Sequence, residues 1–146
     1  MSLKCLNILV LSILLVIGVG GCASSTIETP ENKILTQIIE SITPQEAFTL
    51  IRNNQNNLDF IIVDVRTSEE FTDGHIENAV QIDFYSETFR NELDSLDKDN
   101  AYLIYCQSGN RSGRALDMMA ELNFKEVHNI LGGIISWITE GLPIVK

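Results

Sequence analysis

One thiol in the sequence is followed directly by groups that can stabilise an anion. Cys106 ends the apolar run AYLIYC, and the next residues, QSGNRS, are small or polar and include a glycine and an arginine. A cysteine attacks as its thiolate, and a free thiol with a pKa of about 8.5 is mostly protonated at neutral pH. The stretch therefore indicates a nucleophile if its residues lower the pKa of the thiol, and a buried core cysteine if they do not.

Residues 107–112 offer two ways to lower that pKa. A helix expected to begin near Arg111 would direct unpaired N–H groups toward the thiol, and Arg111 and Arg114 would add positive charge. The intervening residues are not bulky and apolar, so their N–H groups can turn inward around one anion, helped by the permissive backbone of a glycine. Such a cradle would hold a thiolate, a persulfide or a sulfonate group. Its expected members are Gln107, Ser108, Gly109, Asn110, Arg111 and Ser112.

The N-terminal segment is typical of an export signal. Lys4 precedes an apolar run from Leu6 to Val19, which is shorter than the roughly 20 residues of a membrane span. The ending VGGC resembles the bacterial lipobox, whose cysteine is lipidated and becomes the new N-terminus. We expect a signal peptide at 1–21, lipid attachment at Cys22 and a tether through residue 35. The protein would then be exported and anchored to the cell membrane, on the outer membrane or periplasmic face in a Gram-negative cell. An uncleaved membrane anchor is the alternative.

Cysteine usage and charge restrict the chemistry further. Cys5 leaves with the expected signal peptide and Cys22 carries lipid, so Cys106 is the one thiol left in the folded part. It cannot form an internal disulfide, although exported domains ordinarily use cysteines in such pairs. The net charge of −10, or −11 once residues 1–21 are removed, argues against nucleic acid as a partner. It also argues against adhesion to anionic lipid head groups, so the acyl chains would provide the anchoring.

Residues 36–146 are expected to form one domain in which strands and helices alternate. Apolar runs predict strands at 60–65, 79–83, 101–106 and 127–130. Helices are expected after the capping box of Thr43 and Glu46, within 84–96, from 111 to the stop signal Asn123, and at 134–141, whereas 67–78 is expected to be a polar connection. The alternation predicts an α/β fold with a mainly parallel sheet and helices on both faces. Ligands of such sheets bind beyond the carboxyl ends of the strands, where Cys106 falls.

Five segments of the chain occur in an order and at a spacing that are typical of a known family. They are VDVR (63–66), EEF (69–71), GHIENAVQID (74–83), YCQSGNRS (105–112) and LGGIISW (131–137). Together they resemble the single-domain form of the rhodanese family of sulfurtransferases, whose sheet has about five short strands. The resemblance implies that Cys106 takes a sulfane sulfur from thiosulfate or another persulfide or polysulfide, and passes it to a thiol or cyanide. A protein donor or acceptor fits the same scheme, and no cofactor or metal is implied.

Other functions remain open as alternatives. Cysteine-dependent phosphatases place five residues between cysteine and arginine to wrap a tetrahedral phosphate, whereas four separate Cys106 from Arg111. The shorter loop suits the smaller persulfide sulfur. A catalytically silent module for binding or sensing is a second alternative, and a thiol that detects oxidants is a third.

Two residues of VDVR and a histidine lie near the loop in the expected fold. Asp64 and Arg66 are expected to be supporting residues, with Arg66 paired to a glutamate of EEF and Asp64 accepting backbone N–H groups. Their position also allows a direct electrostatic effect on Cys106. The family resemblance places His75 in a structural turn, so we do not expect it to be a general base.

The residue directly after the cysteine departs from the family pattern. Many members with this loop carry a basic residue there, whereas this chain has Gln107. A neutral side chain attracts dianionic thiosulfate less, and the acidic surface does not steer it inward. We therefore expect the donor to be a protein persulfide, a polysulfide or a small organic persulfide.

Replacing Cys22 by serine tests the expected lipid anchor. The variant lacks the thiol to which the lipid would be attached, so we expect it to move from the membrane fraction to the soluble fraction. Cell fractionation with immunoblotting measures this, and Cys5→Ser is the control that should stay with the membrane. A Cys22→Ser protein that remains membrane-bound would instead support an uncleaved anchor.

Overall fold

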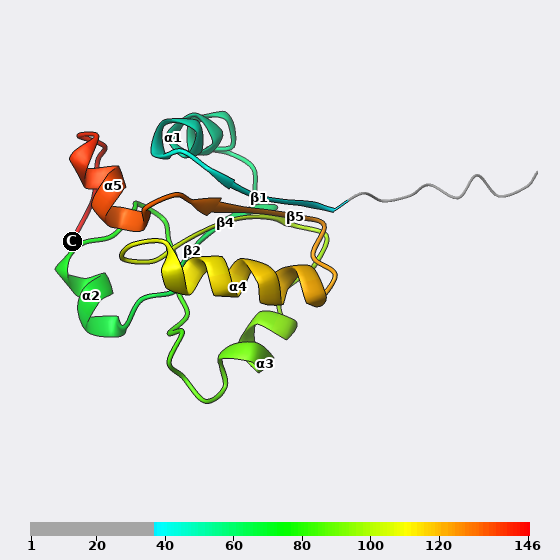
Figure 1. The fold of residues 1–146 in the computed structure, drawn as a ribbon. Helices are drawn as coiled ribbons and strands as arrows, with labels where there is room; N and C mark the ends of the chain where they lie inside the picture. Colours follow the sequence, from blue (N-terminus) through cyan, green and yellow to red (C-terminus); the bar gives the residue numbers. More distant parts are fainter. Residues whose placement is uncertain (1–36) are drawn as a thin grey trace, which may run out of the picture. The chain divides into compact units, whose positions relative to one another are not determined.

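A computed structural model describes residues 37–146, so the expected signal peptide, Cys22 and the tether lie outside the described residues. Five parallel strands form one sheet in the order β1-β5-β4-β2-β3 (Figure 1). The strands are β1 (Ile38–Ile42), β2 (Phe60–Asp64), β3 (Val80–Gln81), β4 (Ala101–Tyr105) and β5 (Glu126–Ile130). The expected α/β class and parallel sheet are confirmed.

Helices cover both faces of this sheet, because parallel neighbours must be joined by crossover connections. Figure 1 shows α1 and α5 on one face, with α3 and α4 on the other. The helices are α1 (Pro44–Asn53), α2 (Ser68–Asp73), α3 (Phe89–Asp94), α4 (Asn110–Glu121) and α5 (Gly133–Thr139). Within 37–146 we find no helix that is both long and apolar enough to span a membrane.

The central strand β4 is fixed by packing on both faces. Its side chains alternate, so Tyr102 and Ile104 join the core under α3 and α4, while Leu103 and Tyr105 join the core under α1 and α5. All four side chains are completely buried. Cys106 follows this strand directly, so its backbone starts from a rigid position.

Local signals set several element boundaries as expected. The Thr43 hydroxyl accepts from the backbone N–H of Glu46 at 3.3 Å, and the Glu46 carboxylate accepts from the backbone N–H of Thr43 at 2.8 Å, which completes the capping box. The chain leaves α4 at Asn123, whose φ of 65° is the predicted left-handed conformation.

Three elements differ from the expectation. The helix α2 lies in the segment expected as a polar connection, and it buries none of its residues, so it has no apolar stripe to reveal it. The strand β1 was not predicted, because it is a partly exposed edge strand. The strand β3 is shorter than 79–83, because it pairs with β2 at only two positions.

Truncating Met119 tests the core beneath α4. The side chain is fully buried, so Met119→Ala should leave a cavity and lower the free energy of unfolding by about 3 kcal/mol. The adjacent, half-buried Met118 gives a matched control, and Met118→Ala should cost less than half as much. Urea unfolding followed by the fluorescence of the single tryptophan, Trp137, measures both. Equal losses would contradict the core position of Met119.

Candidate active site

The thiol of Cys106 lies at the base of the loop that connects β4 to α4. The residue is 1% exposed. Its Sγ accepts hydrogen bonds from the backbone N–H of Gly109 at 3.2 Å and from the hydroxyl of Ser112 at 3.4 Å. Of the expected cradle, the structure thus brings Gly109 and Ser112 into contact with the sulfur.

The pKa of Cys106 lies below its ordinary value. Burial disfavours the thiolate and raises the pKa, but hydrogen bonds from the hydroxyl of Ser112 and from the backbone N–H groups of Ser112, Ser108 and Gly109 outweigh it. The positive end of α4, which begins at Asn110, acts in the same direction. The thiolate is therefore stabilised chiefly by hydrogen-bond donors of the loop.

The carbonyl groups of the loop are bound by the first turn of α5. The backbone N–H of Ile134 donates to the carbonyl of Cys106 at 2.8 Å, and that of Ile135 donates to the carbonyl of Gln107 at 3.2 Å. Because these two carbonyls bond to α5, the backbone N–H groups of the residues after them remain free to face the sulfur.

Two glycines permit this close approach. Gly133 has a φ of 60°, and a Cβ there would overlap the carbonyl of Cys106. Gly109 has a φ of 92°, and a Cβ there would lie 3.2 Å from the backbone nitrogen of Gly132. Both positions thus combine a left-handed backbone with a tight contact, and glycine satisfies both constraints.

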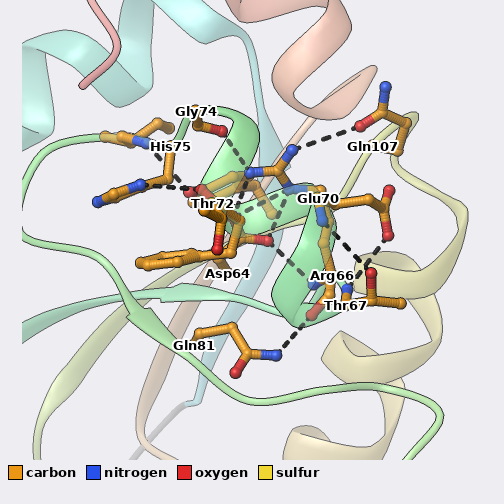
Figure 2. Close-up of polar contacts among 12 residues, drawn as sticks. Asp64, Arg66, Thr67, Glu70, Thr72, Gly74, His75, Gln81 and Gln107 are labelled. Atoms are coloured by element: carbon orange, nitrogen blue, oxygen red, sulfur yellow. Dashed lines mark hydrogen bonds and ion pairs between the residues drawn. The ribbon is translucent and has the colours of Figure 1, made fainter. Parts of the chain in front are cut away.

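Arg66 pairs with Asp64, which corrects the expectation that it would pair with a glutamate of EEF. Its Nε lies 2.9 Å from each oxygen of the Asp64 carboxylate, and the pair is 4% and 0% exposed. The expected backbone bond is also present, because the Asp64 carboxylate accepts from the N–H of Arg66 at 2.9 Å. Arg66 further donates to the carbonyl of Gly74 at 2.7 Å and to the side chain of Gln107 at 3.5 Å (Figure 2). The spacing of two residues at the strand end allows this pairing.

Arg111 is held by Glu70, and its charge still lies within electrostatic reach of the Cys106 thiol. Its guanidinium donates to the two carboxylate oxygens at 2.7 Å and 2.6 Å. The bonds from Arg111 lower the pKa of Glu70 to about 2, and the same bonds raise the pKa of Arg111. Glu70 also accepts from the backbone N–H of Thr67 at 3.1 Å in the capping box of α2, which Figure 2 shows.

The side chains of the remaining predicted residues form no hydrogen bond with Sγ within the described part of the chain. The guanidinium of Arg114 is 4.9 Å from the ring centre of Phe84, on the exposed side of α4. The side chains of Ser108 and Asn110 belong to exposed residues, so their expected contribution is through the backbone. His75 stacks on Phe71 with 3.8 Å between ring centroids, in agreement with a structural turn.

Two residues support the site in ways that the sequence did not predict: Glu70, expected as a possible partner of Arg66, and Tyr105. Glu70 binds Arg111, and the pattern from Thr67 to Glu70 is a capping box that could have located it. The hydroxyl of Tyr105 accepts from the backbone N–H of Ile76 at 3.1 Å, which ties the strand before the loop to the turn after α2. No sequence pattern signals that second contact.

Comparison with known proteins agrees with this geometry. The rhodanese-like domain family matches residues 45–140. A sulfurtransferase of Allochromatium vinosum is 38% identical over 87 residues, which cover 60% of this chain and 79% of that protein. A tRNA uridine(34) hydroxylase of Photorhabdus laumondii is 34% identical over 99 residues, which cover 61% of this chain but only 28% of that protein. The crystal structure of a rhodanese-related protein from Thermoplasma volcanium has 30% identity and a TM-score of 0.61, over 73% of this chain and 97% of that one. With a family match over most of its length and a cysteine loop at the end of β4, the chain belongs to the rhodanese-like domain family.

Proposed function

We propose that the protein is a sulfurtransferase that carries a sulfane sulfur as a persulfide on Cys106. Membership of the family and the likeness to a sulfurtransferase support the general activity. The observation that carries the finer proposal is the setting of Sγ, which receives hydrogen bonds from Gly109 and Ser112 and has a lowered pKa. A stabilised thiolate in a ring of donors can attack a sulfane sulfur without a general base.

The reaction runs in two displacement steps. The Cys106 thiolate attacks the outer sulfur of the donor, the sulfur–sulfur bond of the donor breaks, and the leaving group departs with the electron pair, as sulfite from thiosulfate or as a thiolate from an organic persulfide. An acceptor then attacks the outer sulfur of the persulfide. With cyanide as the acceptor the product is thiocyanate, and with a thiolate as the acceptor it is a new persulfide. In both cases the Cys106 thiolate is restored.

The hydrogen-bond donors around Sγ suit both states of Cys106. When the thiolate becomes a persulfide, the negative charge moves outward by one sulfur atom. In the persulfide the negative charge lies on the terminal sulfur, and the N–H groups of Ser108, Gly109 and Ser112 that bond to Sγ would then face a charge one atom farther out. The loop is short, because four residues separate Cys106 from Arg111. A single sulfur therefore fits better than a tetrahedral phosphate, which makes a phosphatase the weaker proposal.

The location and partners belong to the same proposal. A lipid at Cys22 would hold the enzyme at a membrane outside the cytoplasm, where donor and acceptor must then be available. The net charge of −10 disfavours RNA binding, so the activity named for the tRNA uridine(34) hydroxylase is not extended to this chain. The donor is a small sulfane compound or a protein persulfide, and the acceptor is a thiol or cyanide.

Mass measurement of the intact protein tests the persulfide. After incubation with thiosulfate or polysulfide, the chain should gain the mass of one sulfur atom, and cyanide should remove it. Cys106→Ser should gain nothing, because the attacking thiolate is absent. Absence of an adduct with every sulfane donor would refute the proposal, and a stable sulfenic acid in its place would support the oxidant sensor.

Removing one hydrogen-bond donor tests the origin of the lowered pKa. Ser112→Ala deletes the hydroxyl that bonds to Sγ, so the pH profile of thiol alkylation should move to higher pH. A bond to a charged group contributes about 1.5–3 kcal/mol, so sulfur loading at neutral pH should slow by about tenfold or more.

The neighbouring serine gives the matched control. Ser108 acts through its backbone N–H and is exposed, so Ser108→Ala should leave the alkylation profile in place. An unchanged profile in Ser112→Ala would show that its hydroxyl does not stabilise the thiolate. Alkylation with iodoacetamide, followed by mass spectrometry over a range of pH, provides the measurement.

A further inference from the structure

Two arginines near the active-site loop, Arg66 and Arg111, are already ion-paired. Arg66 is bound to the buried carboxylate of Asp64, and Arg111 is bound at two points by Glu70. Arg114 lies against Phe84, and the position after the cysteine holds the neutral Gln107. The charge that the two ion-paired arginines would bring to the loop is therefore largely cancelled by the two carboxylates.

Glu70 occupies a fixed position for this pairing. One of its carboxylate oxygens accepts from the backbone N–H of Thr67 at 3.1 Å and from Arg111 at 2.7 Å, while the other accepts from Arg111 at 2.6 Å. The Arg111 side chain is 15% exposed and that of Glu70 is 30% exposed, so water screens the pair only in part. The start of α2 thus holds the carboxylate that neutralises the arginine of the loop.

Sulfane donors differ in the charge that they bring to this site. Thiosulfate is a dianion, and its leaving group, sulfite, is also a dianion at alkaline pH. An organic persulfide, RSSH, brings no charge on the reacting sulfurs when protonated and one when ionised. A loop whose arginines are paired gives up much of the attraction that a dianion needs, while it loses little for a persulfide.

We propose that Glu70 is a specificity-determining residue that makes the site select low-molecular-weight organic persulfides over thiosulfate by holding Arg111 in an ion pair. This inference rests on the proposed sulfur transfer through Cys106. The selected step is RSSH plus the Cys106 thiolate giving RS⁻ plus the Cys106 persulfide. One sulfur–sulfur bond forms and one breaks, and the electron pair leaves with RS⁻, so no oxidant or reductant is consumed.

The variant Glu70→Gln separates the charge of this residue from its structural contacts. Glutamine also serves in a capping box, so α2 keeps its cap while Arg111 loses its anionic partner. We expect kcat/KM for thiosulfate, relative to kcat/KM for glutathione persulfide with cyanide as acceptor, to rise by about tenfold. The gain should shrink as salt is added, because salt screens the partly exposed charge of Arg111.

Glu69→Gln is the matched control for net charge. Glu69 precedes Glu70 in α2, is exposed, and forms no ion pair within the described part of the chain. Its substitution removes the same unit of charge without releasing Arg111, so the ratio between the two donors should stay within about twofold of the original.

A binding measurement gives a readout that does not depend on turnover. In the Cys106→Ser background, thiosulfate binding measured by calorimetry should tighten by about tenfold when Glu70→Gln is added. Unchanged binding together with an unchanged donor ratio would overturn the inference, and so would a parallel loss of activity with both donors. These results differ from failure of the proposed function, in which the unmodified protein takes no sulfur from either donor.

Discussion

Two backbone hydrogen bonds between the first turn of α5 and the loop after β4 hold the candidate active site in shape. They bind the carbonyls of Cys106 and Gln107, which would otherwise need water or another partner. The helix that provides them is itself fixed, because Trp137 is buried in the core and its indole N–H donates to the carbonyl of Pro143 at 2.9 Å. The packing beneath α5 thus supports the hydrogen bonds that reach the sulfur.

The electrostatics of the site follow from this arrangement. Neutral donors of the loop lower the pKa of Cys106, and the nearby arginines are bound to Asp64 and Glu70. A buried ion pair is weak evidence for stability, because desolvation offsets much of its attraction. Its clearer effect is positional: the pair of Asp64 and Arg66 connects the end of β2 to the turn at Gly74 and to the loop at Gln107. The thiolate is therefore stabilised without an open cluster of positive charge.

Local signals in the sequence predicted the parts of the fold that depend on local interactions. The capping box at Thr43, the buried run of β4 and the left-handed stop at Asn123 are decided by a few neighbouring residues. The strand β1 escaped prediction because it is a partly exposed edge strand, and α2 because it buries no residue. Neither has the apolar period from which an element is recognised.

The site shows the same division between local and distant interactions. Cys106, Gly109 and Ser112 lie within one loop and one helical turn, so their spacing was enough to predict that they meet. The partners of the arginines depend on the packing of separate elements. Arg66 forms an ion pair with Asp64, two residues away, whereas Arg111 forms one with Glu70, which is 41 residues away along the chain. Charge complementarity alone did not distinguish between these pairings.

The contact between Gly109 and Gly132 has a consequence for how this domain can diversify. A Cβ at Gly109 would lie 3.2 Å from the nitrogen of Gly132, so the loop has no room to widen on that side. An inserted residue, which would give the loop the spacing that a phosphate requires, would push against the start of α5. A longer loop would therefore require a compensating shift at the start of α5. In the proposed sulfur transfer, the size of the transferred group would be limited by the start of α5 as well as by the loop that carries the thiol.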